Sequence, residues 1–361
     1  MNPDLDKGGV AEEVLRRYFL AQGFFAVRGA KLRYEGYDVT DVDLYVYCRS
    51  SLYTRERGVV DIKRKRTPQA MERVLWAKGL QRVLSLDRCF VATTDNRAEV
   101  LKFGAEFGVV VLNGDFLKRL ILVPHVHDRI NEEEFSEQLD VGGVGKLGGD
   151  WRGIYDNSKS RLIQALSFDG FNRTLEDAKA GLEAVASSSS QGTGSMRLLY
   201  ISVAHLLLTF DYIAQGLPQF ELEERKRILT DGFRYGDSGK ERSESVVQIS
   251  ATIATSLGGR FKNLGRSLSE EMARQYATIP VEMLAEFFSK ASTLKNVFDL
   301  ACAFEREAFA KLPRPVQSLS ADEQSVIGVL SDFHGVDRKL VFGSLGTAGK
   351  PSAAARKDAP T

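Results

Sequence analysis

Two aspartates and a lysine stand in a pattern that fits metal-dependent chemistry. Asp43 comes directly before the apolar run of Thr-Asp-Val-Asp-Leu-Tyr-Val-Tyr, and Asp61 and Lys63 stand two positions apart in Gly-Val-Val-Asp-Ile-Lys. If residues 42–48 and 58–65 form neighbouring strands, Asp61 and Lys63 project from the same face, about 6 to 7 Å apart along the chain. Asp43 can then meet Asp61 across the two strands.

Two carboxylates that converge on one point repel each other unless a cation neutralises them. Mg²⁺ prefers oxygen ligands and keeps several of its waters, so Asp43 and Asp61, with the Ile62 carbonyl as a third oxygen, form a candidate metal site. A metal there would polarise a phosphodiester and lower the pKa of a bound water. Lys63 would orient that water and offset the charge that develops on the phosphorane. The pattern therefore indicates phosphodiester hydrolysis.

The segment before these strands is predicted to form a helix that carries a third acid. Apolar residues recur at helical spacing in Gly-Gly-Val-Ala-Glu-Glu-Val-Leu-Arg-Arg-Tyr-Phe-Leu, residues 8–20, and Glu13 within it is expected to point at the strand pair. The order of a helix with Glu, a strand with Asp and a strand with Asp-X-Lys resembles the PD-(D/E)XK nuclease superfamily, which has the restriction-endonuclease-like fold. Within that superfamily the chain most resembles the Mrr-like restriction endonucleases.

The chain after the strand pair continues this resemblance. A helical stretch over 67–84, the strand-like Arg-Cys-Phe-Val-Ala-Thr-Thr-Asp, a helix over 96–107 and Gly-Val-Val-Val-Leu-Asn-Gly-Asp-Phe-Leu follow in order. They are similar to the second half of the Mrr-like catalytic domain, and the resemblance covers residues 8–122. It implies a central mixed sheet flanked by helices, a DNA endonuclease that uses Mg²⁺ or Mn²⁺, and a role in restricting foreign DNA.

Two departures from the family pattern concern the acids. Mrr-like proteins often carry Gln or Glu where this chain has Asp61, and the shorter acid keeps the class of ligand. Asp41, two residues before Asp43, is a rival ligand if the strand is shifted by one repeat. Asp43 is preferred because it directly precedes the apolar run, whereas Asp41 and Asp38 are expected in a loop or turn.

Basic residues cluster around the predicted site although the net charge of the chain is only +1. Such residues would make phosphate contacts that release counterions and render nucleic-acid affinity salt-dependent. Arg64 and Arg66 point away from Lys63 in a regular strand. The candidate nucleic-acid-binding residues are therefore Arg55, Arg57 and Lys65, and the alternative is a solvated rim of the strand pair.

Breaks in the sequence pattern divide the 361 residues into unequal parts. Residues 1–122 form the predicted nuclease-like domain, and the acidic, then glycine-rich, stretch 123–150 is predicted to be a linker. Residues 151–343 show apolar spacing of three and four, which predicts a mostly α-helical domain. Ser and Gly at 187–195 are typical of a flexible connector. The tail 344–361 is predicted to be disordered.

The remaining features indicate a cytoplasmic protein. The three cysteines lack the paired spacing of a zinc site or a disulfide framework. The first residues lack a basic start followed by an apolar core, so secretion is not expected. The most apolar window, 198–214, is interrupted by His205 and Asp211, which favours a buried helix over a membrane span.

The functional hypothesis is a Mg²⁺-dependent DNA endonuclease with Asp43, Asp61, Lys63 and Glu13 as its catalytic residues. Cutting both strands requires two active centres, and twofold symmetry usually provides them, so a homodimer is expected. Two alternatives stay open. One is a non-catalytic subunit whose nuclease-like domain binds nucleic acid or a partner protein, and the other is a ribonuclease.

Overall fold

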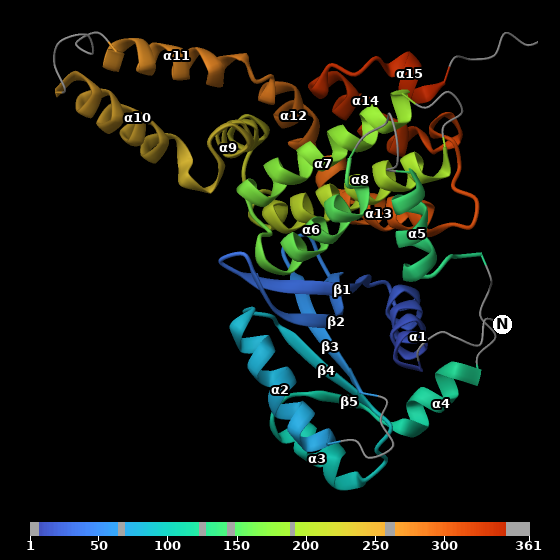
Figure 1. Cartoon of the computed structure of the whole chain (residues 1–361). Helices are drawn as coiled ribbons and strands as arrows, with labels where there is room; N and C mark the ends of the chain where they lie inside the picture. Colours follow the sequence, from blue (N-terminus) through green and yellow to red (C-terminus); the bar gives the residue numbers. More distant parts are fainter. Residues whose placement is uncertain are drawn as a thin grey trace, which may run out of the picture.

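The first part of the chain forms a five-stranded mixed sheet with helices on both faces (Figure 1). The computed structural model describes residues 7–63, 69–122, 128–142, 149–187, 192–256 and 264–343. The elements of the first part are α1 (Lys7–Ala21), β1 (Phe25–Tyr34), β2 (Tyr37–Arg49), β3 (Arg55–Lys63), α2 (Ala70–Val83), β4 (Arg88–Thr93), α3 (Ala98–Glu106), β5 (Val110–Leu112) and α4 (Gly114–Leu122). The strands lie in the order β1-β2-β3-β4-β5, with β1 to β3 antiparallel and β3 to β5 parallel.

The second part of the described chain consists mainly of helices, which lie above the sheet in Figure 1. They are α5 (Glu132–Gly142), α6 (Trp151–Gln164), α7 (Phe168–Ser187), α8 (Thr193–Ile213), α9 (Leu222–Tyr235), α10 (Gly239–Ser256), α11 (Leu264–Thr278), α12 (Val281–Phe288), α13 (Ala291–Phe309), α14 (Ala321–His334) and α15 (Arg338–Phe342). The expected succession of a mixed sheet with helices and a mostly helical region is confirmed at this level.

One face of the sheet packs against α1 and α4. Leu15 and Phe19 of α1 are buried there together with Leu117 of α4. Leu44 and Val60 supply the strand side of this apolar cluster. Burial of such side chains is the main favourable term that holds a helix on a sheet, at about 1.5 to 3 kcal/mol for each large apolar group.

The opposite face of β1 and β2 packs directly against the helical region. The Phe25 ring lies 6.1 Å from the ring of His205 on α8, and the Tyr47 ring lies 5.8 Å from that of Phe298 on α13. Asp211 of α8 reaches the same face and accepts a hydrogen bond of 2.6 Å from the Tyr47 hydroxyl. The sheet and the helices therefore share one apolar core.

α8 is a long apolar helix whose side chains are mostly buried. Within the described residues, the segment Thr193–Gly216, which is α8 and the turn after it, is alone long and apolar enough to cross a membrane, but 83% of its apolar stretch is buried inside the protein. Such burial is that of a helix packed within the core of the fold. The cytoplasmic location stays a prediction.

The predicted linker 123–150 contains a packed helix, so that boundary is corrected. Phe135 and Leu139 of α5 are fully buried one helical turn apart. Asn131 accepts a hydrogen bond from the Glu134 backbone N–H, and the Glu134 carboxylate accepts one from the Asn131 N–H. This reciprocal capping starts the helix at the acidic run. Residues 143–148 of the glycine-rich stretch, 188–191 of the connector and the tail from 344 lie outside the described residues.

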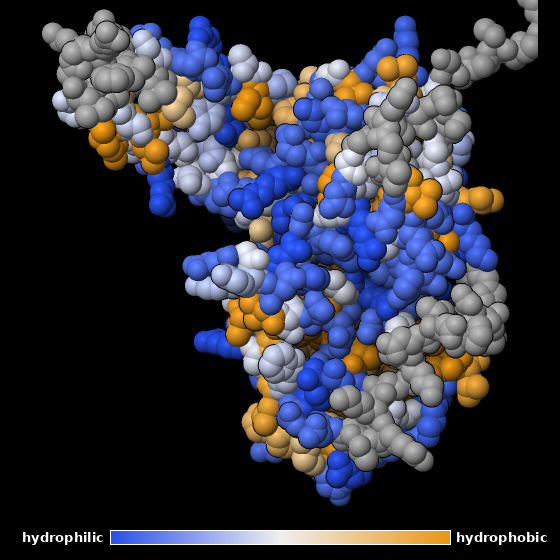
Figure 2. Space-filling model, viewed as in Figure 1, coloured by the Kyte–Doolittle hydropathy of each residue, from blue (hydrophilic) through white to orange (hydrophobic). Residues whose placement is uncertain are grey.

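Helices α10 and α11 form a hairpin that projects from the helical region, at the upper left of Figure 1. Val246, Ile249 and Ile253 of α10 are each more than half exposed. Figure 2 shows apolar side chains gathered on the underside of this hairpin. Nothing in the described structure covers them.

A buried histidine in this core predicts how stability depends on pH. His205 lies 2.6 Å from the Ser158 hydroxyl, and burial lowers its pKa from 6.5 to about 3. The unfolded chain therefore binds a proton that the folded chain excludes, so stability is present above pH 6.5 and is lost as the pH falls towards about 3. We expect His205 to contribute a loss of about 1.4 kcal/mol per pH unit in this window.

Urea unfolding of the wild type and of His205→Gln, from neutral pH down to about pH 5, measures this contribution. The stability difference between the two proteins should decrease steadily on acidification. A difference that does not change with pH would contradict the expected titration of His205.

Candidate active site

Asp43 and Asp61 lie where the β2–β3 ladder ends. The last paired residues are Leu44 and Val60, and continuing this register by one step places Asp43 opposite Asp61. The Ile62 backbone N–H donates a hydrogen bond of 2.7 Å to Asp43 Oδ2. The carboxylate thus takes a strand N–H that the ladder leaves unpaired, and this contact fixes Asp43 next to the Asp61-Ile62 segment.

A glycine on β1 marks the same position in the sheet. The register of β1 with β2 places Gly29 opposite Asp43, and Gly29 has a φ of 64°, in the left-handed region that favours glycine. Val27 and Ala30, on either side of it, face the same core. The alternation of faces is therefore interrupted beside Asp43 without a shift of the register, and this is where the Asp43 carboxylate lies against β3.

The environment of Asp43 disfavours a negative charge that has no cationic partner. Burial raises the pKa of its carboxyl, the Ile62 N–H opposes this, and the nearby charge of Glu12 raises the pKa further. The positive charges of Lys63 and Arg73 lower it. A cation beside Asp43 would therefore stabilise the ionised carboxylate.

Asp61 already has a cationic partner. Its side chain is buried, and Arg73 of α2 donates to both carboxylate oxygens, with 2.7 Å between Nε and Oδ2 and a shorter contact from Nη2 to Oδ1. This is the two-pronged geometry in which a guanidinium binds a carboxylate most specifically. The sequence prediction missed Arg73, although it stands beside the buried stripe of α2 that includes Val74 and Ala77.

Lys63 ends β3 and lies opposite Thr93 of β4. It is half-buried, and its ammonium makes no hydrogen bond or ion pair with any residue in the described part of the chain. Its charge nevertheless reaches Asp43 and lowers that residue's pKa. The structure thus places Asp43 beside the Asp61-Ile62-Lys63 end of β3, and the role of these residues as a site stays a prediction.

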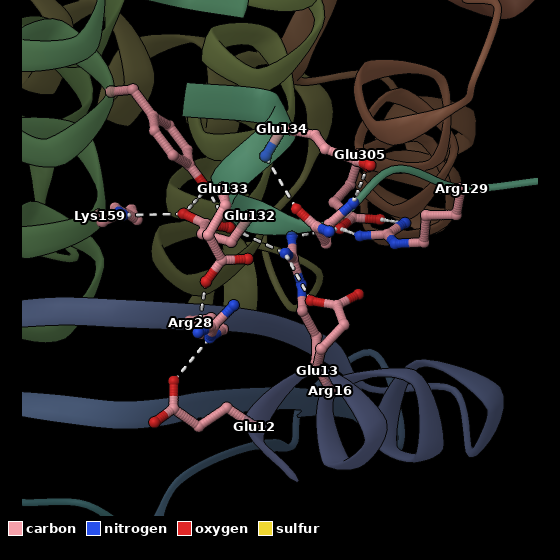
Figure 3. Close-up of polar contacts among 12 residues, drawn as sticks. Glu12, Glu13, Arg16, Arg28, Arg129, Glu132, Glu133, Glu134, Lys159 and Glu305 are labelled. Carbon is pink, nitrogen blue, oxygen red and sulfur yellow. Dashed lines mark hydrogen bonds and ion pairs between the residues drawn. The ribbon is translucent and has the colours of Figure 1, made fainter. Parts of the chain in front are cut away.

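The acid of α1 whose charge acts on Asp43 is Glu12, so the expectation that Glu13 points at the strand pair is corrected. Successive residues on a helix are about 100° apart, so only one of these neighbours can face the strands. Glu13 lies beside Arg16 and Arg17, with 3.3 Å to Arg17 Nε. Glu12 instead binds Arg28 of β1 at 2.6 Å, as Figure 3 shows, and its charge acts on Asp43.

The rival acid Asp41 lies where β2 pairs with β1 but not with β3. It is exposed and lies opposite Lys31 of β1. Asp38 binds Lys31 at 2.6 Å. Both acids lie within β2 rather than in the expected loop or turn, because β2 begins at Tyr37 and continues past β3 along β1. Asp43 is the acid that bonds to β3.

Of the predicted nucleic-acid-binding residues, neither Arg55 nor Arg57 lies at the site. Arg55 is buried and binds Asp211 at 2.6 Å, and it lies at the other end of β3, about 26 Å from Lys63 along the strand. It is not accessible to a phosphate, so this prediction is wrong. Arg57 is also remote and binds the Ser85 carbonyl at 2.7 Å. Lys65 lies outside the described residues.

The donor atoms at the site fit a hard divalent cation. Asp43 and Asp61 supply carboxylate oxygens, and the Ile62 carbonyl is the predicted third ligand. In the described ranges no group of three or more His, Cys, Asp or Glu side chains gathers to hold a metal. Two carboxylates suit Mg²⁺, which keeps several waters, better than a metal that needs a full set of protein ligands.

Comparisons with protein-family models, with curated proteins and with solved structures find no match for this chain. The arrangement of the acidic pair and Lys63 is therefore what supports a function.

Proposed function

We propose that this chain is a divalent-metal-dependent endonuclease that hydrolyses phosphodiester bonds in DNA, with a restriction-endonuclease-like catalytic region over residues 1–122. The observation that carries the proposal is the 2.7 Å hydrogen bond between the Ile62 N–H and Asp43 Oδ2, because it joins the strand with Asp43 to the strand with Asp61 and Lys63. Two acids and an ammonium group are thereby held at one end of a strand pair.

The order and direction of the elements support the same proposal. A helix, three antiparallel strands, a helix and a fourth strand parallel to the third follow one another, with the acids on the second and third strands. This succession resembles the catalytic core of the PD-(D/E)XK nucleases. The proposal includes a role in restricting foreign DNA and a homodimer in which two chains supply two centres.

Each residue of the site would have a separate role in the reaction. Asp43 and Asp61, with the Ile62 carbonyl, would hold Mg²⁺ or Mn²⁺. When bound, the cation would polarise the phosphodiester and acidify a water molecule. Lys63 would orient the attacking water and offset the negative charge that builds up on the phosphate oxygens. Glu12, which Arg28 holds at 2.6 Å, would add negative potential at Asp43 and favour a cation there.

One observation favours a second candidate, a non-catalytic subunit that binds nucleic acid or a partner protein. Both oxygens of Asp61 accept hydrogen bonds from Arg73. If this ion pair is permanent, Asp61 stabilises the fold and is not a metal ligand. Nuclease-like folds can serve in binding alone, since function depends on the site and not on the fold.

A plasmid-nicking assay with Mg²⁺ or with EDTA tests the proposal. We expect the wild type to nick DNA only with the metal. Asp61→Ala and Lys63→Ala should each lose about 10²-fold or more in rate, the effect typical of removing a group that stabilises transition-state charge. Lys102→Ala, an exposed residue of α3, is the matched control and should retain the wild-type rate.

Equal and metal-independent results for all four proteins would exclude a nuclease and favour the binding subunit. Labelled RNA in a parallel reaction distinguishes the ribonuclease alternative. Cleavage of RNA but not DNA, with the same dependence on Asp61 and Lys63, would show that the substrate is RNA and would support the same mechanism.

A further inference from the structure

Arg73 holds Asp61 in a way that differs from how Asp211, the buried carboxylate of α8 that packs against the sheet, is held. Asp211 is closed in by several donors, including Tyr47 at 2.6 Å and Arg55 at 2.6 Å, and it has no exposed surface. In the described chain Asp61 has a single cationic partner, Arg73, whose side chain is 21% exposed. The partner of Asp61 can therefore reach solvent, whereas the partners of Asp211 are enclosed.

We propose that Arg73 is an exchangeable counterion, which neutralises Asp61 before the metal binds and is displaced from it when a divalent cation arrives. This inference rests on the proposed function, because it assigns the cation to the same aspartate. Both the guanidinium and the cation need the oxygens of Asp61, so each must weaken the binding of the other.

The acidic pair needs such a counterion. Asp43 lies next to Asp61 and, within the described residues, receives a hydrogen bond from the neutral Ile62 N–H and none from a cation. Two carboxylates with no positive partner would repel each other and destabilise this end of the strands. Arg73 supplies one positive charge where a divalent cation would supply two, so the exchange leaves the pair better neutralised.

Arg73 has a second neighbour that would remain beside it after it leaves Asp61. Its guanidinium carbon lies 5.6 Å from the ring centroid of Trp76, three residues along α2, and Trp76 is 47% exposed. Cations bind over the face of tryptophan at such distances. A released Arg73 would remain near Trp76 and Asp61, where it can meet a phosphate of the substrate. Arg73 is thus a positioning residue in the metal-free protein.

Binding of Mn²⁺ alone, measured through the electron paramagnetic resonance of the free ion, tests the proposal without any cleavage reaction. Arg73→Gln should bind Mn²⁺ about tenfold more tightly than the wild type, because its competitor for Asp61 is gone. Arg82→Gln, exposed near the end of the same helix and about 13 Å along its axis, loses the same charge and should bind as the wild type does. Asp61→Asn should abolish the tight site in either background.

The outcomes separate this inference from the proposed function. If the wild type and Arg73→Gln bind Mn²⁺ equally and Asp61→Asn does not, the metal site stands and the exchange is refuted. If none of the proteins binds Mn²⁺, both proposals fail. Arg73→Lys, which keeps the charge and loses the second hydrogen bond, should bind with intermediate affinity, and circular dichroism confirms that each variant is folded.

Tryptophan fluorescence provides a second readout. Trp76 and the buried Trp151 are the two tryptophans of the chain, so a Trp151→Phe background reports on Trp76 alone. Mg²⁺ should change the Trp76 emission when Arg73 moves, and the change should be absent with Arg73→Gln. Unchanged emission at Mg²⁺ concentrations that fill the site would refute the release of Arg73.

Discussion

Replacement of Asp43 by asparagine should lower the rate of DNA cleavage about 10³-fold, which corresponds to about 4 kcal/mol of transition-state stabilisation. Asparagine keeps an oxygen that can accept the Ile62 N–H, now at 2.7 Å, so the end of the strand pair should remain in place. What the variant loses is the negative charge that attracts a divalent cation. Single-turnover cleavage of a labelled duplex at saturating Mg²⁺ measures the effect.

Asp41→Asn is the matched control for this prediction. It makes the same chemical change two residues earlier on β2, at an exposed acid of the β1–β2 ladder, and cleavage should stay within about twofold of the wild type. A larger loss from Asp41→Asn than from Asp43→Asn would show that the ligand was assigned to the wrong strand position. Equal unfolding midpoints would show that neither result comes from misfolding.

Replacement of Arg16 by methionine should destabilise the protein by about 3 to 5 kcal/mol. Figure 3 shows Arg16 of α1 among the carboxylates of the helical region, with Glu132 of α5 at 2.9 Å and Glu305 of α13 at 3.0 Å. The Arg16 side chain is fully buried, so methionine keeps much of its volume and leaves buried negative charges less well neutralised. Urea unfolding followed by circular dichroism measures the change.

The neighbouring Arg17 provides the control on the same helix. Its side chain is 25% exposed, and its one ion pair in the described structure is with Glu13 at 3.3 Å. Arg17→Met should cost less than about 1 kcal/mol, as for other partly exposed pairs. Similar losses from Arg16→Met and Arg17→Met would mean that the buried ion pairs of Arg16 do not hold α1 to the helical region.

The sequence was sufficient to predict the strand pair and its two acids. Alternation of apolar residues over 42–48 and 58–65 is a local signal, and β2 and β3 form over the described part of these ranges, in a register that continues to Asp43 opposite Asp61. The nuclease assignment that these residues suggest stays a proposal. The orientation of α1 about its own axis could not be predicted in this way. Apolar spacing located the helix but did not establish which of its two adjacent glutamates faces the strands.

Pairings between distant segments could not be predicted in the same way. Arg55 was expected to bind nucleic acid because it stands in a basic run, but its partner Asp211 lies 156 residues further along the chain. Arg73 is closer, 12 residues after Asp61, yet a contact between a strand and the following helix depends on how that helix packs. α5 was missed for another reason, because its acidic first turn was interpreted as linker composition while the capping pair that starts it was overlooked.

The core that the sheet shares with α8 and α13 affects how inactive variants should be interpreted. Phe25 and Tyr47 depend on rings of those two helices for their burial, so a change in either helix can disturb the strand that carries Asp43. Loss of cleavage after a substitution there would not identify a surface that recognises DNA. Only variants whose unfolding curves match the wild type can map substrate contacts onto the helices.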